Sequence, residues 1–166
     1  MTFKGTISCA VSGVLRFAQV KHPKLGLEFT TKESVTLTLS VHLSGCKGTT
    51  SQAGATIVSG YAEGTVVGDF SCASMLNSVP SPTGKLAWTT KGNPAAPSTI
   101  SLTAGVLKSG PPPTVSFKTT AKGSFAGSGK TTDAVVQTIG ALVSSCKTSP
   151  YLTKVALNAK KSTFGV

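Results

Sequence analysis

The sequence predicts a mainly β protein, an antiparallel β-sandwich or barrel that carries one α-helix and one short helical turn. Two observations favour this fold class: apolar and hydroxyl side chains alternate in several segments, and Gly/Pro-rich turns separate these segments. The chain has 166 residues, which is the size of one domain. We therefore expect residues 1–166 to form a single β-sandwich-like domain.

The clearest strand is VTLTLSVHLSGC at 35–46, where apolar residues alternate with Thr, Ser and His. A period of two places one set of side chains in the core and the other in water. Shorter alternation predicts further strands at 7–11, 86–88, 100–102, 115–117 and 155–157, and residues 56–67 are predicted as one or two strands interrupted by Gly60 and Gly64. The turn-rich stretches between them are NSVPSPTGK (77–85), KGNPAAPS (91–98) and KSGPPPT (108–114).

Two segments break the β pattern. In SCASMLN (71–77), Ser71 can cap a single helical turn that buries Cys72 and Met75. Over 132–146 the apolar residues recur at helical spacing, with Thr132 as the predicted N-cap. We expect one helix near 132–146, ended by the turn at Pro150, and a final strand near 153–164.

The chain has four cysteines and no closely spaced pair of the kind that binds zinc. We expect no metal and no other cofactor. The even count is typical of two disulfides formed in an oxidising compartment, and three connectivities are possible. We favour Cys72 with Cys146, because both lie on predicted helical elements. Cys9 and Cys46 would then join the first strand to the end of the long strand.

The N-terminal MTFKGTISCAVSG lacks the apolar core and cleavage site of a signal peptide, and no run of 18 apolar residues predicts a transmembrane segment. The cysteines nevertheless favour a secreted, extracellular domain whose signal peptide is not part of this sequence. A cytosolic protein is the alternative.

The formal net charge is +11, and 15 of the 16 basic residues are lysines scattered along the chain. Specific nucleic-acid recognition relies on arginine and on stacking aromatic residues, so we do not expect it. Attraction to anionic envelope polymers, such as teichoic acid or acidic glycans, fits this charge better. A protein partner is the other expectation, and the oligomeric state stays open.

The stretch GSFAGSGKTT (123–132) is similar to a phosphate-binding loop. Gly129, Lys130 and Thr131 match the end of G-x-x-x-x-G-K-[ST], but the first glycine would fall at Ser124. The chain also lacks the repeated βαβ units of nucleotide-binding folds, so we expect no nucleotide site. Gly129, Lys130, Thr131 and Thr132 remain candidates for an anion-binding helix start.

Catalytic residues are not expected. The histidines are His22 in a turn and His42 on the polar face of the 35–46 strand, and no G-x-S-x-G motif accompanies the serines. Trp88 is in phase with Leu86, which favours a place in the core over a sugar-stacking platform. A hydrolase built from dispersed residues is the least favoured hypothesis.

The order of these motifs resembles that of secreted β-rich proteins of actinobacteria, including mycobacteria and streptomycetes, for which no activity is known. The resemblance rests on ISCAVSGVLRF, VTLTLSVHLSGCKG, SCASML, GKLAW, GSFAG and ALVSSC. It implies export and a β-sandwich-like fold, and it implies no active site.

The sequence therefore favours a secreted, disulfide-stapled domain that binds a cell-envelope glycan or a protein partner and does not catalyse a reaction. The alternative is a structural or adaptor subunit that assembles through an exposed strand edge.

Overall fold

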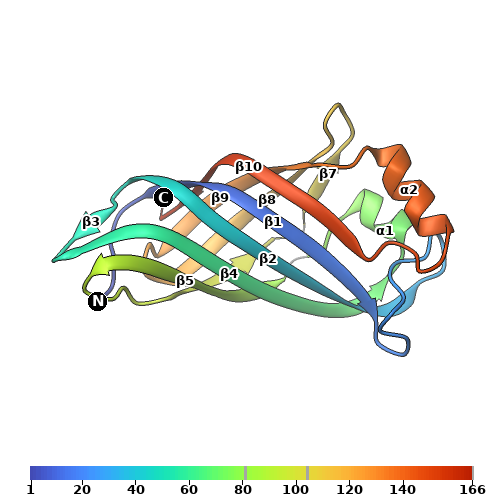
Figure 1. The fold of residues 1–166 in the computed structure, drawn as a ribbon, viewed down its shortest axis with the longest axis horizontal. Helices are drawn as coiled ribbons and strands as arrows, with labels where there is room; N and C mark the ends of the chain where they lie inside the picture. The colour runs from blue at the N-terminus through green and yellow to red at the C-terminus, as the bar shows by residue number, and fades with distance from the viewer. Residues whose placement is uncertain (81, 104, 166) are drawn as a thin grey trace.

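The computed structural model describes residues 1–80, 82–103 and 105–165, and it is a closed antiparallel β-barrel of eight strands with two short extra strands and two short helices (Figure 1). This confirms the predicted fold class and decides between its two forms in favour of the barrel. The elements are β1 (Ile7–Gln19), β2 (Glu33–Gly48), β3 (Ser51–Gln52), β4 (Ala55–Phe70), α1 (Cys72–Asn77), β5 (Thr83–Gly92), β6 (Ser98–Leu102), β7 (Val106–Lys108), β8 (Thr114–Gly123), β9 (Gly127–Val135), α2 (Ile139–Lys147) and β10 (Lys154–Phe164).

The eight barrel strands follow one another around the ring in chain order, as β1, β2, β4, β5, β6, β8, β9 and β10. The first and last strands then pair with each other, from Ile7 opposite Phe164 to Arg16 opposite Lys154. Every barrel strand therefore has a partner strand on both sides, although residues 87–92 of β5 pair with β4 alone.

Alternation along each strand divides the side chains between the interior and the outer surface. In β1, for example, Ile7, Cys9, Val11 and Leu15 are buried, whereas Ser12 is exposed. An eight-stranded barrel has an interior just wide enough to be filled by side chains. The barrel interior is therefore the hydrophobic core.

Both chain termini lie at one end of the barrel (Figure 1). Four aromatic side chains, which we call the aromatic plug, pack together at this end. It consists of Phe3, Trp88, Phe125 and Phe164, with ring centroids 5.0–6.2 Å apart in the contacting pairs. The Trp88 indole donates a hydrogen bond to the Ser98 hydroxyl at 2.9 Å. Trp88 thus belongs to the core, as predicted, and forms no surface platform.

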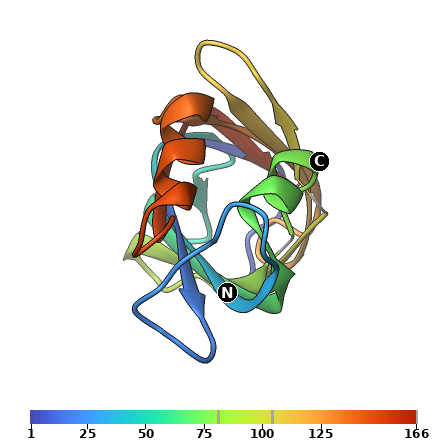
Figure 2. The same cartoon turned by 90° about the vertical axis from the view of Figure 1, so that its right-hand side faces the viewer.

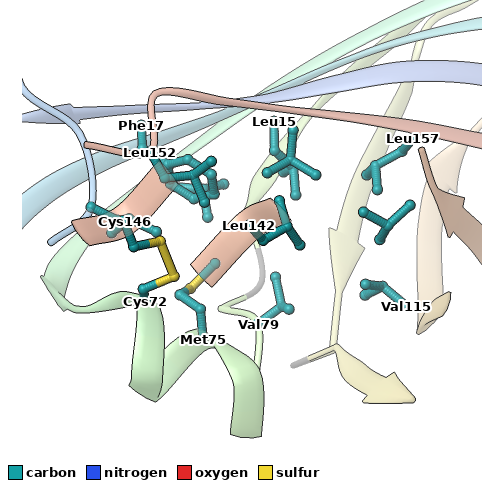
Figure 3. Packing of buried hydrophobic residues seen from close by; sticks show 14 of the residues in the cluster. Leu15, Phe17, Cys72, Met75, Val79, Val115, Leu142, Cys146, Leu152 and Leu157 are labelled. Carbon is teal, nitrogen blue, oxygen red and sulfur yellow. A yellow bond between two sulfur atoms is a disulfide. The ribbon is translucent and has the colours of Figure 1, made fainter. Parts of the chain in front are cut away.

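The opposite end is covered by α1, α2 and the loop between β1 and β2 (Figure 2). Helix α1 has Ser71 as its N-cap and buries Cys72 and Met75, as the sequence predicts. Leu142 and Cys146 of α2 face the same apolar cluster, and the Cys72–Cys146 disulfide joins the two helices (Figure 3). We call these two helices and their disulfide the helical cap.

The second disulfide joins Cys9 of β1 to Cys46 of β2, so both bonds have the pairing that we favoured from the sequence. Two disulfides in a small β-barrel fit a disulfide-stabilised extracellular domain. Among the described residues, neither helix has the length and apolar character that a membrane-crossing helix needs.

The predicted start of the long helix is wrong by seven residues. Residues 132–135 belong to β9, and α2 begins at Ile139, where the Thr138 hydroxyl accepts a hydrogen bond from the backbone N–H of Ala141 at 3.1 Å. The sequence TTDAV at 131–135 has no apolar alternation, although in the structure Thr131, Asp133 and Val135 are buried and Thr132 is exposed. Pairing with β8 and β10 on its two sides gives its backbone groups hydrogen-bond partners as a strand.

We expect the double substitution Cys72→Ser/Cys146→Ser to lower the free energy of unfolding by about 2–4 kcal/mol, because the bond closes a long loop in the unfolded chain. The sequence separation of the two cysteines is 74 residues. Urea denaturation followed by circular dichroism measures this change. An unfolding free energy equal to that of the native protein would show that the disulfide of the helical cap does not stabilise the fold.

Gly84 should be far less tolerant of a side chain than Gly140. A Cβ atom on Gly84 would lie 1.9 Å from the Glu63 carbonyl oxygen on β4, whereas a Cβ atom on Gly140 of α2 meets nothing within 4 Å. We expect Gly84→Ala to lower the melting temperature, and Gly140→Ala to leave it unchanged or to raise it because alanine favours helix. Equal effects of the two substitutions would refute close packing of β4 on β5.

Candidate functional site

The residues that we predicted as an anion-binding helix start lie in the middle of β9. Gly129, Lys130, Thr131 and Thr132 are strand residues, so no helix N-terminus stands behind them and this part of the prediction is wrong. Strand alternation separates their side chains. Lys130 and Thr132 are exposed on the outer surface, whereas Thr131 is buried inside the barrel.

Lys130 belongs to a group of lysines on the outer faces of three adjacent strands, β8, β9 and β10. All of them are exposed, and we call this surface the basic wall. Lys130 lies opposite Lys118 of β8 on one side and opposite Thr163 of β10 on the other. The six lysines of the basic wall are Lys118, Lys122, Lys130, Lys154, Lys160 and Lys161.

A β-bulge explains why two consecutive lysines of β10 are both exposed. Between Asn158 and Ser162 β10 advances by four residues, while β9 advances by three, from Ala134 to Thr131. The extra residue interrupts the alternation, so Lys160 and Lys161 both reach solvent. The bulge therefore concentrates positive charge at one place on the wall.

A surface groove of about 470 Å³ lies next to this bulge, above the Cys9–Cys46 disulfide. Lys47 of β2, Lys160 and Lys161 line it, together with the hydroxyl-bearing residues Thr6 and Ser8. Its remaining lining residues are Cys9, Ala10, Gly45 and Gly48. Three ammonium groups beside hydroxyl groups and small residues can receive an anionic group such as a phosphate or carboxylate.

No acidic side chain is exposed on β8, β9 or β10, although Glu28 lies beside Tyr151, three residues before Lys154. Asp133 is the one acid in the sequences of β8, β9 and β10, and it is buried inside the barrel. The other acids are Glu28, Glu33, Glu63 and Asp69, which lie in the β1–β2 loop or on β2 and β4. The wall therefore has one sign of charge, which raises the local concentration of anions.

The remaining residues that the sequence singled out form no reactive group with one another. His42 is exposed on β2, as predicted, and its ring meets the edge of Tyr61 with centroids 5.5 Å apart. The Tyr61 hydroxyl donates a hydrogen bond to Glu63 at 2.9 Å. These three residues lie on β2 and β4, away from the basic wall.

Sequence reasoning treated the lysines as scattered and so missed the wall. Period two alone places Lys118 and Lys122 on one face of a strand. That Lys130 lies beside Lys118, and that the bulge exposes Lys160, depends on the register between strands. No local sequence signal reports that register.

The buried carboxyl of Asp133 should lower the free energy of unfolding as the pH rises. A carboxylate in an ion pair has the opposite effect. Burial raises the pKa of Asp133 above its ordinary value of 3.8, and the hydrogen bond from Thr131 offsets part of this. The native state therefore binds the proton more tightly than the unfolded state, and ionisation of Asp133 destabilises the native state as the pH rises above 3.8.

We expect the unfolding free energy of Asp133→Asn, relative to that of the native protein, to increase with pH from 3.8 up to the raised pKa and then to stay constant. Urea denaturation of both proteins between about pH 3 and pH 8 tests this, a window that spans the usual pKa of Asp and a raised one. A difference that is independent of pH, or that falls with pH, would show that burial does not raise the pKa of Asp133.

Comparison of the chain with protein-family models, with curated proteins and with solved structures finds no match.

Proposed function

We propose that this protein is a secreted, non-catalytic binding domain whose basic wall holds an anionic polymer of the cell envelope, such as teichoic acid or an acidic glycan. The observation that carries the proposal is the gathering of six exposed lysines on the outer faces of three adjacent strands, with no acidic side chain among them. The disulfides support a location outside the reducing cytosol. The resemblance to secreted actinobacterial proteins points the same way and stays a prediction.

The spacing of the lysines favours a polymer over a single small anion. Lys118 and Lys130 lie opposite each other on neighbouring strands, which are about 4.8 Å apart. Lys118 and Lys122 are four residues apart on one strand, or about 13 Å at ~3.3 Å per residue. Charges that recur over such distances match the repeated phosphates or carboxylates of a polymer chain, which many weak contacts would hold together.

The composition of the wall argues against nucleic acid as the polymer. Phe117 and Phe164 are the aromatic residues in the sequences of β8, β9 and β10, and both are buried. Bases would find no exposed aromatic ring for stacking on these three strands, and one arginine, Arg16 of β1 opposite Lys154, borders six lysines. Lysines act as point charges, which suit flexible polymers whose anionic groups vary in orientation.

A structural subunit that assembles through an exposed strand edge is less well supported. Each of the eight barrel strands is paired on both sides along at least part of its length, and the lengths paired on one side only, such as residues 87–92 of β5, are short. Assembly with a protein would therefore rely mainly on side chains of the outer surface.

Two matched variants test the proposal. Lys118→Gln/Lys130→Gln/Lys160→Gln/Lys161→Gln removes four charges from the basic wall. Lys21→Gln/Lys24→Gln/Lys32→Gln/Lys91→Gln removes four charges from exposed lysines elsewhere. Both variants therefore have the same net charge. Binding of purified wall teichoic acid and of hyaluronate is measured by isothermal calorimetry at several salt concentrations, with neutral dextran as the negative control.

We expect the wall variant to lose at least about tenfold in affinity for the anionic polymers, because each lysine near an anionic surface contributes on the order of 1 kcal/mol. The control variant should lose less than about threefold, since its charges act only through the screened field of the whole molecule. Equal losses in the two variants would show that net charge, and not the wall, attracts the polymer. Binding that salt does not weaken would reject an electrostatic interface.

A further inference from the structure

The interior of the barrel is not filled along its whole length. Between the aromatic plug and the helical cap lies a cavity of about 70 Å³, which we call the interior cavity. Its wall is largely apolar and includes Val11, Leu39, Leu43, Leu86, Phe117 and Phe164. The two buried apolar clusters lie toward the two ends of the barrel, so the cavity occupies the level between them.

The buried polar side chains that line the interior cavity come from one side of the barrel, whereas Glu63 of β4, which also lines it, is exposed. Thr119 of β8, Thr131 and Asp133 of β9, and Ser162 of β10 are all at least 91% buried and all line it. Register explains their proximity, since Thr131 lies opposite Ser162. This polar side is the inner face of the three strands that carry the basic wall outside.

Gly129 leaves room for the Thr119 hydroxyl. It lies opposite Thr119, and a Cβ atom on Gly129 would lie 2.4 Å from the Thr119 hydroxyl oxygen and 2.1 Å from the carbonyl oxygen of Thr163. Any larger residue would displace β10 or fill the space beside that hydroxyl. Gly129 of the GSGKTT stretch therefore shapes the interior of the barrel and does not belong to a phosphate-binding loop.

The hydrogen-bonding capacity of this polar side is incompletely used. Among the described residues, the buried Thr119 hydroxyl has no hydrogen-bond partner. Asp133 accepts one hydrogen bond, from the Thr131 hydroxyl at 2.8 Å, and a carboxylate can accept several. A buried polar group without a partner destabilises the fold, so an occupant that supplied the missing bonds would bind favourably.

We propose that the interior cavity is a binding site for a short aliphatic molecule whose polar end accepts a hydrogen bond from the buried Thr119 hydroxyl. An alcohol or ketone of about four non-hydrogen atoms has this chemistry. Its carbon chain would contact Leu39, Leu43 and Leu86 on the apolar side. The site does not depend on the basic wall and adds a second ligand to the one proposed above.

The volume of the cavity sets the size of the ligand. A cavity of about 150 Å³ lined by aliphatic and aromatic residues binds benzene, and one water occupies about 30 Å³ in the liquid. At about 70 Å³ the interior cavity therefore suits a molecule smaller than benzene, or about two waters. The aliphatic wall favours a molecule with a carbon chain, because waters there would have few hydrogen-bond partners.

The probes are 2-propanol and acetone, which share a carbon skeleton and differ in that acetone cannot donate a hydrogen bond. Methyl NMR spectra of the intact, oxidised protein are recorded during titration with each probe. We expect saturable shifts of the Leu39, Leu43 and Leu86 methyl groups with 2-propanol. Acetone should bind with comparable affinity, because its carbonyl oxygen can accept the same hydrogen bond from Thr119.

Thr119→Val and Thr120→Val form a matched pair of variants, since Thr119 points inward and Thr120 is exposed on the same strand. Both keep the shape of the side chain and remove its hydroxyl. We expect Thr119→Val to weaken 2-propanol binding at least about fivefold and Thr120→Val to leave it unchanged.

Three results would overturn the proposal. The first is a failure of acetone to bind, or equal effects of the two variants. The second is shifts that grow without saturation and appear equally at the exposed methyl groups of Val58 and Val67, which would indicate a solvent effect. The third is a high-resolution crystal structure in 2-propanol in which ordered waters alone occupy the interior cavity.

Discussion

The pairing of β1 with β10 is the constraint on which the rest of the structure depends. These strands lie at the two ends of the chain, and their register runs from Ile7 opposite Phe164 to Arg16 opposite Lys154. Without this pairing the remaining hairpins would form an open, twisted sheet with two long free edges. Closure removes those edges and obliges every second side chain to fit inside a tube of fixed width.

The contents of the tube differ along its length because its two ends are closed in different ways. Aromatic rings fill the end near the termini, and two short helices tied by the Cys72–Cys146 disulfide cover the other. Neither the aromatic plug nor the helical cap extends to the middle of the barrel. There β8, β9 and β10 present hydroxyl groups and the Asp133 carboxyl, and the opposite strands present aliphatic residues, so that the packing leaves the interior cavity.

The same three strands carry both sites that we propose. Their outward residues form the basic wall, and their inward residues form the polar side of the interior cavity. Alternation makes the two faces independent, since adjacent side chains on a strand point to opposite sides of the sheet. The burial of Asp133 also keeps its negative charge away from the surface where lysines gather.

The sequence alone determined the β class, the long alternating strand at β2, the helical turn after Ser71, the core position of Trp88 and the last strand, because each depends on a local periodicity or cap. It also allowed the cysteine pairing to be chosen among three. Only the tertiary structure decided that the sheet closes, that 132–135 is strand, and that Lys130 stands beside Lys118 while Asp133 faces a cavity. Register and closure arise from pairing between distant segments, and the sequence TTDAV at 131–135 has no strand pattern of its own, so that pairing with β8 and β10 makes it a strand.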